Sequence, residues 1–201
     1  MNHAADDIPS DGELVRRAQA GESAAFDVLM MRYQDRVYNT CYRMCNNRED
    51  AADLTQSTFL RAYEALGRFR TEARFFTWLY RIAVNLALTH RRRARLRRTL
   101  SLVGSDEQRA GHEPVDAHQS AAPSNRLQAQ EQQRLLAEAL AQLDEEYRAA
   151  VVLRDIEGLD YAAIAEILDV PVGTVKSRIF RGRMMLREML ETAEEHERDA
   201  G

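Results

Sequence analysis

The chain has 201 residues, of which 45% are hydrophobic and 30% are charged, and its formal net charge is −4. The hydrophobic content supports one or two real cores, and the charged content is typical of a soluble protein with much exposed helix. No segment approaches the ~18 apolar residues of a membrane span, and the polar, acidic N-terminus is not typical of a signal peptide. We therefore expect a cytoplasmic protein without membrane insertion.

The two cysteines, Cys41 and Cys45, lie four residues apart on one predicted helix. This spacing places two thiols on the same face, which is half of a metal site. No second pair of Cys or His follows at ligand spacing, so we expect two small buried side chains in a reducing compartment. We therefore expect neither a metal nor a cofactor.

Helical periodicity runs through most of the first hundred residues, and strand signals are nearly absent. Asp11 is the expected cap of a short first helix that ends near Gly21. The second helix is expected to end at Asn46 and Asn47, and the third at Gly67. The pattern predicts one compact helical domain at 11–98, with longer helices at about 23–45, 49–66 and 77–98.

Residues 99–127 lack sustained periodicity and are rich in Ser, Ala, Gly, Pro and acidic side chains, which predicts a flexible acidic linker. Periodicity then resumes, with a leucine stripe at Leu136, Leu140 and Leu143. A second helical domain is expected at 128–192. The predicted fold is therefore all-α, with two small helical domains joined by a linker.

Residues 160–187 have the pattern of a helix-turn-helix. Tyr161, Ile164, Ala165 and Leu168 form the predicted apolar face of the first helix. A Pro-Val-Gly corner follows, with Thr174 as the expected cap of the second helix. The inward stripe of that helix is expected at Val175, Ile179, Gly182, Leu186 and Leu190. Hydroxyls and guanidinium groups face outward, which suits phosphate and base contacts in a major groove, although a solvated charged helix has the same composition.

A second unusual stretch, residues 68–81, interleaves aromatic side chains with arginines. Such rings either close the end of a helical bundle or stack on unpaired bases. Immediately downstream, residues 90–98 hold six arginines and no acid, which gives this helix a positive end suited to duplex phosphate. That run favours the nucleic-acid interpretation of the stretch.

Three segments in this order resemble the extracytoplasmic-function sigma factors, the two-domain members of the bacterial sigma-70 family. They are DLTQSTFLRAYEALGRF (53–69), FRTEARFFTWLYRIAVN (69–85) and PVGTVKSRIFRGR (171–183). The resemblance covers most of residues 11–190. It implies a region 2 bundle that binds the clamp helices of core RNA polymerase and melts the −10 promoter element. It also implies a region 4 helix-turn-helix that reads the −35 element.

The resemblance also implies roles for particular residues. Core-polymerase binding is carried over to Asp53, Gln56 and Phe59. Recognition and melting of the −10 element, including a pocket for a flipped-out base, is carried over to Phe69, Arg70, Thr71, Glu72, Ala73, Arg74, Phe75, Trp78, Asn85, Arg91, Arg92 and Arg93. Recognition of the −35 element is carried over to Thr174, Lys176, Ser177, Arg178, Phe180 and Arg181.

This sequence departs from the family pattern at three places. Ser57 stands where a glutamate is usual, Thr71-Glu72-Ala73 stand where Gly-Asp-Ser is frequent, and Lys176 often has an arginine counterpart. A lysine is a point charge rather than a planar fork, so bidentate recognition of a base at Lys176 is not implied.

The predicted function is that of a promoter-specificity subunit, with core RNA polymerase, promoter DNA and an anti-sigma factor as partners. One alternative is a helix-turn-helix regulator that does not associate with core polymerase, which would leave the aromatic–arginine stretch unexplained. An enzyme such as a helical nuclease would need clustered histidines or paired acids. The five histidines are scattered, so we expect no catalytic site.

Overall fold

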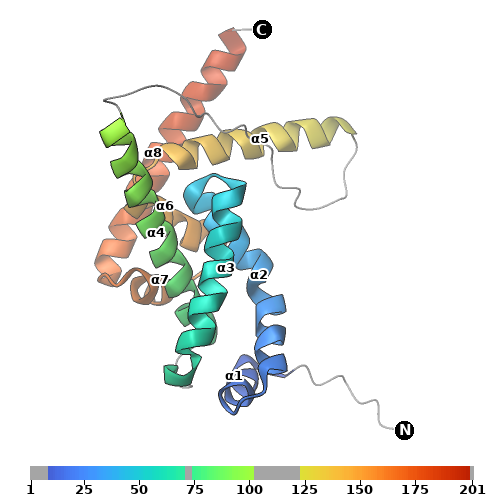
Figure 1. Ribbon diagram of the computed structural model, residues 1–201. Coiled ribbons are helices and arrows are strands. Elements are labelled where there is room, and N and C mark those ends of the chain that lie inside the picture. Colours follow the sequence, from blue (N-terminus) through green and yellow to red (C-terminus); the bar gives the residue numbers. More distant parts are fainter. Residues whose placement is uncertain (1–8, 71–73, 102–122, 200–201) are drawn as a thin grey trace.

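The structure in Figure 1 is a computed structural model that describes residues 9–70, 74–101 and 123–199. Within these ranges all regular secondary structure is helical, as predicted. The N-terminal helical unit comprises α1 (Asp11–Gln19), α2 (Ser23–Cys45), α3 (Arg48–Ala65), the 3-10 turn η1 (Leu66–Arg68) and α4 (Phe75–Ser101). The C-terminal helical unit comprises α5 (Pro123–Gln142), α6 (Glu145–Val151), the π-helical turn η2 (Val152–Ile156), α7 (Tyr161–Leu168) and α8 (Val172–Asp199).

The predicted break between α2 and α3 is confirmed. Asn46 adopts the left-handed conformation with φ 55°, and its N–H donates to the carbonyl of Tyr42. Asn47 then caps α3, because its side chain accepts a hydrogen bond from the N–H of Asp50 at 3.0 Å. The predicted end of the next helix near Gly67 is also confirmed, since α3 ends at Ala65 and Gly67 lies in the short turn η1 that follows, without a positive φ.

Two predicted helix caps are wrong. Ser10, and not Asp11, caps α1, accepting from the backbone N–H of Glu13. The Asp11 carboxylate instead accepts a hydrogen bond from the hydroxyl of Tyr33 on α2. Because α8 already begins at Val172, Thr174 lies inside its first turn. Ser10 and Asp11 look equivalent as caps in the sequence, and at Asp11 a contact with Tyr33, about twenty residues away, takes the place of capping.

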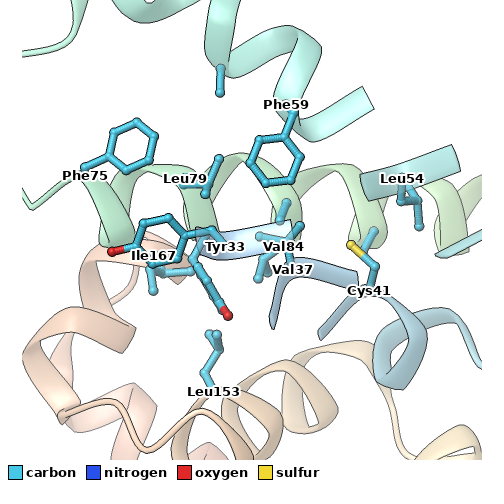
Figure 2. Packing of buried hydrophobic residues seen from close by; sticks show 14 of the residues in the cluster. Tyr33, Val37, Cys41, Leu54, Phe59, Phe75, Leu79, Val84, Leu153 and Ile167 are labelled. Atoms are coloured by element: carbon cyan, nitrogen blue, oxygen red, sulfur yellow. The ribbon is translucent and has the colours of Figure 1, made fainter. Parts of the chain in front are cut away.

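One hydrophobic core runs through both helical units. Tyr33 and Val37 on α2 and Leu79 on α4 are buried in the same cluster as Leu153 of η2 and Ile167 of α7. Figure 2 shows these side chains directed toward one another from the two units. The two units were predicted as separate domains joined by a linker, and in the structure they pack directly on each other. The predicted linker, residues 99–127, begins within α4 and ends within α5, and its middle, 102–122, lies outside the described residues.

A smaller core closes the far end of the C-terminal helical unit. Leu140 and Leu143 pack there with Val151, Val152 and Leu186, and α5 and the end of α8 extend beyond the rest of the bundle (Figure 1). The predicted leucine stripe is therefore confirmed, with Leu136 partly buried against this core and Leu143 just after the end of α5.

The two thiols lie inside the N-terminal helical unit. Burial raises the pKa of Cys41 to about 12 and that of Cys45 to about 11. Both side chains therefore stay protonated near neutral pH and are weak nucleophiles.

Candidate nucleic-acid interface

The helix-turn-helix forms as its pattern predicts. Asp160 caps α7 by accepting from the N–H of Ala163 at 2.8 Å. The inward stripe of α8 is buried at Val175, Ile179, Gly182 and Leu186. On α7, Ile164 and Ile167 are the fully buried residues, although Ile167 was outside the predicted apolar face. Ile167 was missed because its burial comes from the N-terminal helical unit, which covers a second face of this short helix.

Gly182 permits the close crossing of α8 over α6. A Cβ at this position would lie 2.7 Å from Cγ2 of Val151 and 3.3 Å from Cβ of Tyr147. Carbon atoms in packed cores are normally separated by 3.5 Å or more. The absence of a side chain at Gly182 thus lets α8 pack closely against α6.

The outward face of α8 carries the predicted DNA-binding side chains. Lys176, Ser177, Phe180 and Arg181 are exposed, and Phe180 is 68% exposed. Arg178 is partly covered and forms an ion pair with Glu146 on α6, with 2.5 Å between nitrogen and oxygen. These side chains present hydroxyl, apolar and cationic groups side by side, as base and phosphate contacts require.

The aromatic side chains before α4 form a cluster that closes one end of the bundle. Phe69 and Phe75 are buried, at 8% and 3% exposure. The ring centroid of Phe69 lies 4.8 Å from that of Trp78, and Phe75 lies 5.7 Å from the same ring. In this conformation Phe69 and Phe75 belong to the core rather than to a surface for stacking bases. The predicted pocket residues Thr71, Glu72 and Ala73 lie outside the described residues.

A side chain that the sequence did not single out anchors the start of this connection. The amide nitrogen of Gln19, the last residue of α1, donates to the carbonyls of Leu66 and Phe69, both at 2.9 Å. The two bonds tie α1 to the turn that leads into the predicted −10 segment. An exposed-looking glutamine at a helix end carries no sequence signal for a contact about fifty residues away.

One face of α4 is polar and open to solvent. Arg81 and Asn85 are exposed on this face, and Trp78 is half-buried at its edge; Arg74 is exposed just before α4 begins. Further along α4 the basic run continues with Arg92 and Arg93 exposed and Arg91 half-buried. The structure therefore brings Trp78, Asn85 and the arginine run together along one helix, as an interface for a nucleic-acid backbone requires.

The third predicted surface lies on α3. Asp53 and Gln56 are exposed, whereas Phe59 is only 6% exposed and contributes to the core. Beside them a groove of about 690 Å³ runs between α2 and α3. It is lined by Met30, Gln34, Asp35, Tyr38, Ala52, Thr55, Gln56, Phe59, Leu60 and Tyr63. Leu60 and Tyr63 are 59% and 53% exposed, and the sequence analysis did not single out this apolar edge of the groove.

Both helical units match known family models. Residues 29–97 match the model described as Sigma-70 region 2, and residues 133–186 match the model described as Sigma-70, region 4. The chain is 38% identical over 185 residues to the ECF RNA polymerase sigma-E factor of Haemophilus influenzae, covering 90% of this chain and 96% of that protein. It is 36% identical over 184 residues to the RNA polymerase sigma-H factor of Pseudomonas aeruginosa, covering 90% of this chain and 94% of that protein.

The chain belongs to the ECF sigma factors of the sigma-70 family. The resemblance in its three motifs is therefore confirmed, and it is an RNA polymerase sigma factor. The alternative of a helix-turn-helix regulator without polymerase is not favoured, because the region 2 match covers most of the N-terminal helical unit.

Solved structures share this fold. CnrH, solved in complex with the cytosolic domain of CnrY, is 25% identical with a TM-score of 0.65, covering 90% of this sigma factor and 97% of that chain. RpoE of Bartonella quintana, solved with the anti-sigma factor NepR, is 23% identical with a TM-score of 0.66. The match covers 83% of this sigma factor and 96% of that chain.

The described residues of the sigma factor contain neither a membrane-spanning helix nor a metal-binding cluster. None of the helices in 9–70, 74–101 and 123–199 is both long and apolar enough to cross a lipid bilayer. The same ranges contain no group of three or more His, Cys, Asp or Glu side chains that could hold a metal ion.

Proposed function

We propose that this sigma factor directs core RNA polymerase to promoters with three surfaces of its own: the α2–α3 groove, the polar face of α4 and the outward face of α8. The observation that carries the proposal is that exposed arginine, asparagine and hydroxyl side chains lie on two helices whose opposite faces are buried in a core. The protein then acts in the cytoplasm and catalyses no reaction itself. Reconstitution of the chain with core polymerase, followed by sequencing of the transcripts, tests this proposal. A chain that does not bind core polymerase would contradict the proposal.

The groove between α2 and α3 is the proposed contact for the clamp helices of core polymerase. It offers exposed apolar side chains, Leu60 and Tyr63, next to the polar groups of Asp53 and Gln56. Protein interfaces commonly combine an apolar centre with a polar rim. Phe59 also lines the groove, at 6% exposure, and keeps its proposed part in this contact.

Leu60→Ala should weaken core-polymerase binding about ten- to thirtyfold, because truncating a well-packed anchor costs about 1.5–2 kcal/mol. Leu96→Ala is a matched control, since Leu96 is 61% exposed, close to the 59% of Leu60, but lies on α4 outside the groove. A pull-down titration against core polymerase measures both variants. Equal binding by Leu60→Ala and Leu96→Ala would place the contact elsewhere.

The −10 element is assigned to the polar face of α4. Asn85 and Arg81 are exposed one turn apart there, near the half-buried ring of Trp78. A flipped-out base needs hydrogen-bonding partners and a stacking surface to offset its lost stacking. Arg70 and Arg74 flank the pocket segment, and Arg91, Arg92 and Arg93 are assigned to the duplex backbone.

The −35 element is assigned to α8. If Arg181 contacts a base edge, Arg181→Ala should cost about 1–3 kcal/mol on the preferred sequence and relax discrimination at one position. Promoter binding by holoenzyme to single-base variants of the −35 element measures this. A uniform loss on all sequences would make Arg181 a phosphate contact.

An inhibitory protein partner is also proposed. CnrH has the same fold and is 25% identical in sequence to this sigma factor, and it was solved with the cytosolic domain of CnrY. We expect this sigma factor to be bound by an anti-sigma factor that covers its polymerase-binding or DNA-binding surfaces.

A further inference from the structure

The side-chain amide of Gln19 holds two backbone carbonyls at the entry to the connection between α3 and α4. Its nitrogen lies 2.9 Å from the carbonyl oxygen of Leu66 and 2.9 Å from that of Phe69. A primary amide has two N–H donors on one nitrogen, so Gln19 can give one to each carbonyl. The carbonyl of Leu66 also accepts from the backbone N–H of Phe69 at 3.0 Å, which uses its second lone pair. The turn is therefore bonded within itself and to α1.

The helix that carries Gln19 is itself fixed on α2. Leu14 and Val15, on the inner face of α1, are 1% and 0% exposed. At the start of α1 the carboxylate of Asp11 accepts from the hydroxyl of Tyr33 and pairs with Arg32, with 2.5 Å between nitrogen and oxygen. Because α1 is held at its start and along one face, the amide at its end is a fixed point for the connection.

Phe69 is held from two sides. Gln19 binds its backbone carbonyl, and its ring centroid lies 4.8 Å from that of Trp78 and 5.9 Å from that of Phe75. Phe75 is the first residue of α4, so the two ends of the connection meet in this aromatic cluster. Side chains in a packed core fit closely, so a shift of the Phe69 backbone would change the packing of its ring. The surroundings of the Trp78 ring therefore depend on where α1 holds Phe69.

The aromatic cluster stands next to the side chains assigned above to the −10 element. Arg70 follows Phe69 directly, and Arg74 comes just before α4 begins. Trp78 borders the polar face of α4, where Asn85 is exposed. A binding site needs its groups held within roughly 0.5 Å of the productive geometry by a supporting layer of contacts. The two hydrogen bonds from α1 are such a layer.

We infer that Gln19 is a positioning residue for recognition of the −10 element. It acts through Phe69, whose backbone it holds and whose ring packs against Trp78, rather than by touching DNA. The helix α1 lies before residue 29, where the match to the region 2 model begins, so the anchor lies outside the matched residues. The inference rests on the proposed assignment of the −10 element to α4.

Five variants of the full-length chain test the two hydrogen bonds. Gln19→Glu is nearly isosteric but points acceptors at the two carbonyl oxygens, and Gln19→Met removes the polar groups at similar length. Gln19→Lys keeps N–H donors at this position and is the rescuing variant. Ala20→Glu and Ala20→Lys are the matched controls, because they place the same charges on the next residue, which is exposed and has no polar side-chain group. Circular dichroism checks that every variant keeps its helical content.

The first measurement is the fluorescence of Trp78, the single tryptophan of the chain. In the free protein we expect the emission of Gln19→Glu and Gln19→Met to move toward longer wavelength, because the ring loses packing against Phe69 and meets more water. Gln19→Lys and both Ala20 variants should match wild type. This readout does not depend on DNA or polymerase. Unchanged emission in both Gln19→Glu and Gln19→Met would overturn the inference.

The second measurement is open-complex formation by the reconstituted holoenzyme at a promoter identified by transcript sequencing. We expect Gln19→Glu to reduce it about tenfold, the effect of losing hydrogen bonds of ordinary net strength, with core-polymerase binding unchanged. Asn85→Ala is measured beside it. If Asn85→Ala impairs opening and the Gln19 variants do not, the two bonds serve stability alone and the inference fails. If none of these variants impairs opening, the assignment of the −10 element to α4 fails as well.

Discussion

Asn85→Ala should reduce open-complex formation by the holoenzyme about ten- to a hundredfold. The exposed amide of Asn85 lies on the polar face of α4 and is assigned to the captured base, which exists only after the strands part. A polar group that loses its partner costs about 1–3 kcal/mol, which corresponds to this range of rates. Core-polymerase binding and closed-complex formation should stay nearly intact, because they do not involve an unpaired base.

Permanganate footprinting of unpaired thymines on duplex and pre-opened templates measures this effect. A pre-opened bubble should rescue Asn85→Ala only partly, because strand separation is supplied but the captured base still lacks its partner. Thr89→Ala, one turn further along α4 and also exposed, is the control and should open the promoter normally. Replacing Thr71-Glu72-Ala73 with Gly-Asp-Ser should instead change base preference at the −10 element. Normal opening by Asn85→Ala would make Asn85 an ordinary surface residue.

Gly182→Val should destabilise the C-terminal helical unit by about 1–3 kcal/mol, the usual cost of overpacking a core. A Cβ at Gly182 would meet Cγ2 of Val151 at 2.7 Å, and the backbone carbonyl of Tyr147 lies 3.4 Å away. Valine is stiff at χ1, so the new side chain cannot turn away, and α8 must move off α6. We expect a lower unfolding temperature and loss of transcription from promoters that depend on the −35 element.

Gly173→Val is the matched control, because it makes the same change in the same helix. Outside the backbone of its own helix, a Cβ at Gly173 would meet no heavy atom of the described residues within 4 Å. Thermal unfolding followed by circular dichroism compares the two variants. If Gly182→Val unfolds at the same temperature as Gly173→Val, the crossing of α6 and α8 tolerates a side chain.

The surfaces of this sigma factor differ in how well their sequence predicted them. The recognition helix was predicted correctly, because helical periodicity alone separates Val175 and Ile179 from Ser177 and Arg181. The aromatic stretch was ambiguous because Phe69 and Phe75 would look the same in a core and on a base-stacking surface, and only their contacts with Trp78 place them inside. On α3, the resemblance carried core-polymerase binding over to Phe59, which is only 6% exposed and lines the groove.

The sequence by itself determined the helices, the break at Asn46 and Asn47, the helix-turn-helix and the family, since these depend on local periodicity, capping residues and motifs. The tertiary structure decided what depends on residues far apart in the chain: that Ser10 caps α1, that Gln19 anchors the turn before the −10 segment, and that Glu157 lies against Tyr80. No periodic pattern marks such pairs, because a single glutamate at a helix end is equally compatible with solvent. The two units contact each other through apolar helix faces. Each of these faces could have been covered by other helices, and side-chain packing selects one arrangement.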